Sequence, residues 1–162
     1  MRHPALAALR WVTAEDFPLV DAFHQRCGPT SLLRRWGCRH LPHRTLVRLL
    51  SHTERWLGLG TDNEPVTLVC TGPVSREPGV FDLGLQVADD HQLRGIGTAL
   101  VRHAAEHAHI RGAHTLSAYT EASNQPMLRL LHRLGSVRHT RHGSHLDVRL
   151  HLAASGLTHR PP

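Results

Sequence analysis

Lysine is absent from this chain of 162 residues, so all 19 basic side chains are arginines and the formal net charge is +6. Aromatic residues are also scarce, at 4%, and no nucleic-acid motif accompanies the arginines, so we expect no nucleic-acid partner. Long apolar runs are missing, and the first twelve residues are interrupted by Arg2, Pro4 and Arg10. We therefore expect no secretory signal, no membrane span and a cytoplasmic protein.

Cysteine is sparse as well. Cys27, Cys38 and Cys70 form no C-x-x-C pair, and their odd number argues against a disulfide framework. The hydrophobic content of 40% is enough for one buried core in a chain of this length. We expect one domain over residues 1–152, followed by a flexible tail over residues 153–162.

The most informative stretch joins an expected strand to an expected helix. Residues 80–87 alternate apolar and polar side chains with the two-residue period of a half-buried strand, and residues 99–111 have helical apolar spacing that stops at Gly112. Between them lie Gly95 and Gly97, which let the backbone approach a ligand closely. Unpaired N–H groups at the start of a helix attract an anion, so the stretch predicts a pyrophosphate-binding loop.

Two well-known phosphate loops do not match this stretch. A dinucleotide fingerprint needs a third glycine where this chain has Leu100, and a P-loop needs a lysine that the chain lacks. What remains is Q-x-x-G-x-G after a strand, formed by Gln92, Gly95 and Gly97. This pattern resembles the coenzyme A loop of the GNAT superfamily of acyl-CoA-dependent N-acyltransferases.

The resemblance extends along nearly the whole chain and implies a single-domain α/β (α+β) fold with a central, mostly antiparallel, splayed sheet. The superfamily order is one strand, two helices, three strands, a helix, a strand, a helix and two strands. A capping box of Thr13 and Asp16 opens the first expected helix, and Asn124 opens the last, which Gly135 closes. We expect strands at residues 9–12, 55–59, 66–71, 80–87, 116–120, 136–141 and 146–152, and a second helix at residues 44–50. Residues 23–26 and 32–35 more narrowly resemble bacterial protein-lysine acetyltransferase domains.

The resemblance implies transfer of an acyl group, usually acetyl, from coenzyme A to a primary amine. The backbone of Leu85 and Val87 would pair with the pantetheine arm, and the Val87 amide would polarise the thioester carbonyl. Asn124 and Met127 would contact the same arm. The pyrophosphate would be held by the loop residues Gln92, Leu93, Arg94, Gly95, Ile96, Gly97 and Thr98. Acetyl-CoA is the implied co-substrate, and the resemblance implies no metal.

The groups that move protons are less clearly indicated. Asp82 falls where similar protein-lysine acetyltransferases place a glutamate base, but a solvated aspartate at a strand edge is an equal interpretation. Glu121 is the alternative base. Many superfamily members carry an acidic tyrosine four residues before the closing glycine, and here that residue is Leu131. Tyr119, His132 or water would have to replace it, and helical geometry turns His132 about 100° away from the tyrosine direction, so we favour water.

Two other functions remain open at this stage. A module that binds acyl-CoA without chemistry would keep the same loop. A zinc hydrolase is the remote alternative, because His103, Glu106 and His107 match the H-x-x-E-H pattern. With 16 histidines in the chain such a match arises easily by chance. The sequence leaves open the acceptor amine and the oligomeric state, although dimers are common in the superfamily.

Overall fold

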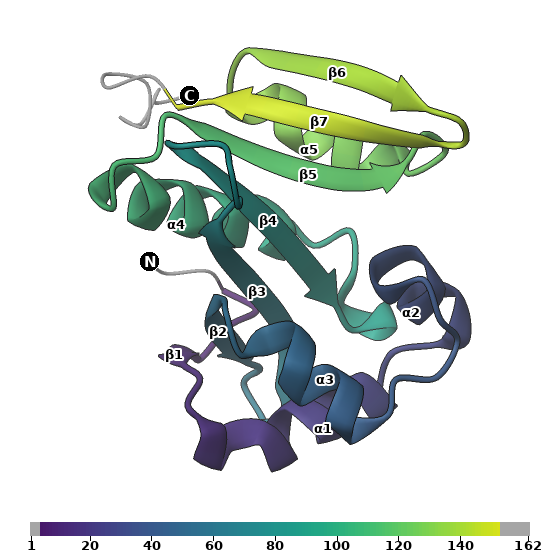
Figure 1. The fold of residues 1–162 in the computed structure, drawn as a ribbon. Coiled ribbons are helices and arrows are strands. Elements are labelled where there is room, and N and C mark those ends of the chain that lie inside the picture. Colours follow the sequence, from purple (N-terminus) through teal and green to yellow (C-terminus); the bar gives the residue numbers. More distant parts are fainter. Residues whose placement is uncertain (1–3, 153–162) are drawn as a thin grey trace.

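Seven strands form one sheet in the order β1-β2-β3-β4-β5-β7-β6 in the computed structural model, which describes residues 4–152 (Figure 1). The pairs are antiparallel except for β4 with β5, which is parallel. The strands are β1 (Ala8–Trp11), β2 (Glu54–Leu59), β3 (Pro65–Pro73), β4 (Val80–Val87), β5 (Thr115–Glu121), β6 (Val137–His142) and β7 (His145–His151). The expected mixed, mostly antiparallel sheet is confirmed.

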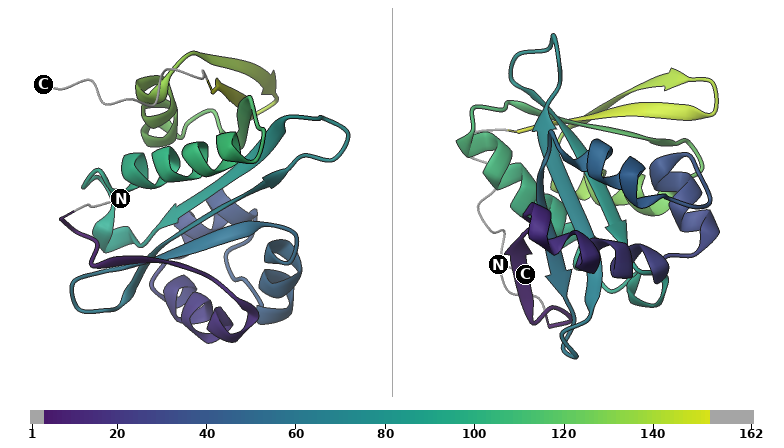
Figure 2. Two further views of the ribbon diagram at one scale, coloured as in Figure 1. Left: turned by 90° about the vertical axis from the view of Figure 1, so that its left-hand side faces the viewer. Right: turned by 60° about the horizontal axis from the view of Figure 1, so that its bottom comes forward.

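Helices cover both faces of this sheet, and each face has its own apolar core (Figure 2). One face packs against α4 (Ile96–Ile110) and α5 (Gln125–Leu134), with Leu100 and Leu116 fully buried between the layers. The other face packs against α1 (Phe17–Gln25), α2 (Pro29–Trp36) and α3 (His43–Leu50), with Phe23 and Leu68 buried. Because side chains alternate along a strand, each residue of β4 faces one of these two layers.

The N-terminal helical region differs from the expected pattern. The sequence predicts two helices between β1 and β2, whereas the structure has three α-helices and a short 3-10 turn, η1 (Ala14–Asp16). The helix that was missed is α2, whose eight residues lie between Gly28 and Gly37 and begin with Pro29. Glycine and proline at these positions are typical of loops. Proline is nevertheless tolerated in the first turn of a helix, and glycine suits the left-handed residue that follows the last helical turn. Gly37 has that conformation, with φ of 71°.

The other local predictions hold closely. Thr13 precedes η1, and its backbone N–H donates to the Asp16 carboxylate at 2.9 Å, as the capping box requires. The final hairpin turns through Gly143, which has φ of 62°. All three cysteines are free thiols. None of the helices described in residues 4–152 is long and apolar enough to cross a membrane. The expected tail at residues 153–162 lies outside the described residues.

Candidate active site

Strands β4 and β5 separate along their length and leave a gap in the middle of the sheet. Their ladder covers only Val80 to Asp82 on β4 against Thr115 to Ser117 on β5, and Figure 1 shows the two strands diverging beyond it. The Ala88 N–H donates to the Val66 carbonyl on β3 at 2.9 Å. Backbone direction alternates along an antiparallel strand, so Leu85 and Val87 turn their N–H and C=O groups away from β3 and towards the gap.

The predicted anion loop lies at the end of this gap. It follows η2 (Asp89–His91) and passes directly into α4, which begins at Ile96. Leu93 and Gly95 both have left-handed backbone conformations, with φ of 61° and 81°. The Thr98 N–H already bonds to the Gly95 carbonyl at 3.1 Å, whereas the first amides of a helix have no intrahelical partner. The amides of Ile96 and Gly97 are therefore the better placed to bind an anion.

Gln92 stabilises the loop from within. Its side-chain Nε2 lies 3.1 Å from the Val87 carbonyl, 3.1 Å from Asp89 Oδ1 and 3.4 Å from Ser31 Oγ. Asp89 in turn accepts hydrogen bonds from the Gly28 N–H at 3.1 Å and from Ser31 Oγ at 2.6 Å. Asp89 therefore caps α2, so the loop, β4 and α2 are held as one unit.

Helix α5 forms the opposite wall of the gap, and its first turn is held by Asn124. The Asn124 side chain accepts from the Met127 N–H at 3.4 Å and donates to Thr120 Oγ1 at 2.9 Å. Gly97 brings α4 close to this wall, because a Cβ there would lie 3.0 Å from Leu130 Cδ1. A Cβ at position 97 would require small shifts of the Leu130 and Leu85 side chains.

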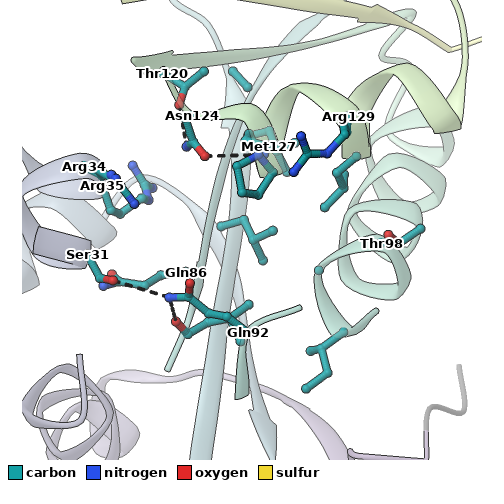
Figure 3. A pocket seen from close by; sticks show the side chains of 18 of the residues that line it. Ser31, Arg34, Arg35, Gln86, Gln92, Thr98, Thr120, Asn124, Met127 and Arg129 are labelled. Carbon is teal, nitrogen blue, oxygen red and sulfur yellow. Dashed lines mark hydrogen bonds between the residues drawn. The ribbon is translucent and has the colours of Figure 1, made fainter. Parts of the chain in front are cut away.

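A cleft of about 420 Å³ runs between α2, β4, the loop, β5 and α5. Figure 3 shows Arg34 and Arg35 reaching in from α2, with Asn124, Met127 and Arg129 on the far wall. Arginine is the only cationic residue type apart from histidine in this chain, and it gives the cleft a positive lining suited to phosphates. The predicted binding residues that line the cleft are Leu85, Val87, Gln92, Leu93, Gly95, Ile96, Gly97, Thr98, Asn124 and Met127. Arg94 does not line it.

Asp82 lies outside this cleft, in a neighbouring hollow that also contains Ser117 and Tyr119. Asp82 is exposed, yet partial desolvation by the protein around its carboxyl group raises its pKa; the Arg35 guanidinium opposes this shift, and the nearby charge of Asp147 adds to it. Five residues of extended strand separate Asp82 from Val87, a distance of about 16 Å. The carboxylate could therefore act at a thioester beside Val87 only through water.

Glu121 and Tyr119 are the other proton-transfer candidates, and both lie on β5. Glu121 forms an ion pair with Arg34 at 3.7 Å and accepts from Ser123 Oγ at 3.2 Å. Tyr119 lines both the cleft and the neighbouring hollow and is 61% exposed, with its ring stacked on His145. Leu131, at the superfamily's tyrosine position, is buried in the core. His132 is exposed and does not line the cleft.

The H-x-x-E-H histidines lie on α4, away from the cleft. His107 Nε2 is 2.6 Å from the Glu54 carboxylate, and His103 packs edge-on against Trp56, with ring centroids 5.1 Å apart. Within residues 4–152 no group of three or more histidine, cysteine or acidic side chains is arranged to hold a metal ion. His107 is thus partnered by the Glu54 carboxylate in this structure.

Several cleft residues were not predicted as site residues from the sequence, among them Ser31, Arg34 and Arg35. All three belong to α2, the helix that is not predicted from the sequence. The sequence does contain a signal for these site residues, because residues 32–35 are part of the resemblance to protein-lysine acetyltransferases. Without a helix there, the direction of the side chains could not be derived.

In this structure two strands of a sheet separate beside a helix N-terminus that can bind an anion. This geometry is typical of proteins that bind an extended, phosphorylated ligand between the two strands. The model of the acetyltransferase (GNAT) family matches residues 7–136. The chain therefore belongs to the GNAT family and is an N-acetyltransferase that uses an acyl-CoA. The expected superfamily is confirmed.

Solved structures support the fold. The GNAT domain of S. lividans PAT superposes with a TM-score of 0.77 at 19% identity, covering 89% of this chain and 89% of that one. The spermidine N-acetyltransferase from Vibrio cholerae, solved with CoA and spermine, gives 0.71 at 15% identity, covering 93% and 96%. Ribosomal-protein-alanine N-acetyltransferase from Brucella melitensis gives 0.68 at 18% identity, covering 88% and 97%. No curated protein sequence shows significant similarity to this chain.

Proposed function

We propose that this enzyme transfers an acetyl group from acetyl-CoA directly to a primary amine while both substrates are bound. The observation that carries the proposal is the continuity of the cleft, which extends from the helix-start amides of Ile96 and Gly97 to the open backbone edge of Leu85 and Val87. An anion-binding end joined to a strand edge fits a ligand with a pyrophosphate at one end and amide groups along its arm.

Each wall of the cleft has a distinct role in this proposal. The loop from Gln92 to Thr98 binds the pyrophosphate, and Asn124 and Met127 orient the pantetheine arm against β4. The Val87 N–H donates to the thioester carbonyl oxygen, where negative charge develops as the amine attacks.

The reaction forms one bond and breaks one. The amine nitrogen bonds to the carbonyl carbon, the carbon–sulfur bond breaks, and the thiolate leaves with the bonding electron pair. Before the attack, Asp82 accepts a proton from the substrate ammonium through a chain of waters and so frees the lone pair of the nitrogen, with Glu121 as the alternative base. The nitrogen loses its second proton to water as the amide forms. Water returns a proton to the thiolate, because Leu131 carries no acidic group.

Turnover of purified enzyme with acetyl-CoA and a mixed panel of amines tests the proposal, with thiol release and product mass as readouts. We expect thiol release that depends on the amine. The Asp82→Asn variant should lose turnover while its coenzyme A affinity stays unchanged. Glu15→Gln is the matched control, because Glu15 is an exposed carboxylate on η1 outside the cleft.

The same experiment separates catalysis from simple binding. The long span from Asp82 to Val87 and the leucine at position 131 are the two observations that favour a module without chemistry. Tight coenzyme A binding with no turnover on any amine would establish that module and refute the transferase.

A further inference from the structure

Arg35 of α2 lies in a small notch over Gly84 of β4, on the side of the gap that faces α2. Its guanidinium lies above Gly84 of β4, so closely that a Cβ at Gly84 would fall 1.7 Å from Nη2. The same Nη2 donates to Cys70 Sγ at 3.2 Å, and the guanidinium carbon lies 4.2 Å from the centre of the Trp36 ring. Gly84 has no left-handed backbone to explain its glycine, so the space that it leaves serves the guanidinium and the Cys70 thiol, which a Cβ would approach to 2.6 Å.

The partners that hold Arg35 are all uncharged. A thiol and an aromatic ring fix its position without neutralising its charge, and its side chain is only partly exposed. Glu121 pairs instead with the neighbouring Arg34. Among the described residues 4–152, no carboxylate lies within 4 Å of Arg35. Arg35 makes no ion pair and interacts with the Asp82 carboxylate only at longer range, so its remaining N–H groups can donate to the carboxylate of a ligand.

That anion is not the pyrophosphate. Gly84 precedes Val87 by three residues, so Arg35 lies about 10 Å along β4 from the point where Gln92 joins the loop to the strand. It also projects from α2, which lies across the gap from α5 (Figure 3). Arg35 is therefore beside the backbone of Leu85, where the acceptor must approach the thioester.

We propose that Arg35 binds a carboxylate of the acceptor, and that the substrates are amines that carry this carboxylate, as free amino acids do. The planar guanidinium fork matches a carboxylate with two parallel hydrogen bonds, which would orient the amine towards the gap. This substrate class rests on the proposed acetyl transfer.

Paired acceptors test this assignment. Each standard amino acid is compared with its amide, which keeps the shape but removes the negative charge. For the best acceptor we expect kcat/KM to be at least about tenfold higher than for its amide, as a hydrogen bond to a charged group implies. Arg35→Ala should abolish this preference, and Arg35→Lys should restore part of it. Arg39→Ala, an exposed arginine outside the cleft, should retain it.

Gly84→Ala provides a second test that leaves the charge in place. The new Cβ would displace the guanidinium, so the preference should fall as in Arg35→Ala, while acetyl-CoA affinity stays unchanged. Thermal unfolding confirms that each variant is folded. The assignment would be overturned if the wild-type kcat/KM were nearly equal for an amino acid and its amide. It would also be overturned if Arg35→Ala lowered kcat/KM by the same factor for both acceptors.

A binding measurement separates this inference from the proposed chemistry. Amino acids are titrated into the complex of enzyme with coenzyme A, which cannot react. Binding that Arg35→Ala weakens at least about tenfold supports the carboxylate site even if acetyl transfer fails. Absence of amino acid binding, together with turnover of amines that lack a carboxylate, overturns the inference and leaves the proposed function intact.

Discussion

Leu93 offers a test in which stability and binding should move in opposite directions. This leucine lies at the tip of the anion loop with φ of 61° and is 88% exposed. A left-handed conformation costs a leucine about 1 kcal/mol, whereas asparagine tolerates it. Leu93→Asn should therefore raise the midpoint of thermal unfolding by roughly 2–4 °C. It should also weaken acetyl-CoA binding about fivefold, because partial burial of the leucine against the cofactor contributes about 1 kcal/mol.

Two further variants separate the effect of backbone strain on stability from the effect of the leucine contact on acetyl-CoA affinity. Leu93→Ala removes the contact but keeps the strain, so its affinity should fall without any gain in stability. Ile110→Asn removes a similarly exposed apolar side chain, 81% exposed at the end of α4, and should leave affinity unchanged. Calorimetric titration and thermal unfolding measure both quantities. Unchanged affinity in Leu93→Asn with a lower unfolding midpoint would refute the assignment of the loop.

Three further predictions concern residues around the cleft and on α4. Asn124→Ala should lower the free energy of unfolding by about 1–2 kcal/mol in denaturant titrations, because it removes the α5 cap and the donor to Thr120; equal stability would show that the cap is unimportant. The raised pKa of Asp82 means that the folded chain holds this proton more tightly than the unfolded chain, so Asp82→Asn should not lower stability at pH 7. The wild-type rate–pH profile should have an acid limb above the ordinary value of 3.8, and any residual rate of Asp82→Asn should lack it; a retained limb would assign the base elsewhere. Glu54→Gln should cost about 1–2 kcal/mol by weakening the contacts to His107 and Arg111, yet acetyl transfer should persist in chelator; loss of activity there would revive the metal hypothesis.

The strands and the anion loop could be predicted because their signals are local. Alternation over residues 80–87 indicates a strand, and Gly95 shows where the backbone turns left-handed. The N-terminus of α5 follows from Asn124 in the same way. These features depend on a few neighbouring residues, so one sequence is sufficient to place them. The expected half-buried strand is wrong in one respect, because helices cover both faces of the sheet: Gly84 and Gln86 are buried, whereas Leu85 and Val87 are only partly buried.

The acceptor side of the site could not be predicted, since it depends on contacts between distant segments. Asp89 caps α2 across 61 residues of sequence, and Arg35 occupies a notch that exists only because Gly84 lies beneath it. The point at which the gap begins, just beyond Asp82, also depends on the register of β4 against β5. The sequence therefore indicated what is bound more clearly than how the acceptor is held.

The most direct test of the account is a crystal structure of the enzyme with coenzyme A. We expect the pyrophosphate on the amides of the Gln92–Thr98 loop and the pantetheine arm in the gap, paired with the backbone of Leu85 or Val87. The reactive sulfur should lie on the side of the gap that faces Arg35. Coenzyme A bound elsewhere, or a pantetheine arm that leaves the gap between β4 and β5 empty, would contradict the account.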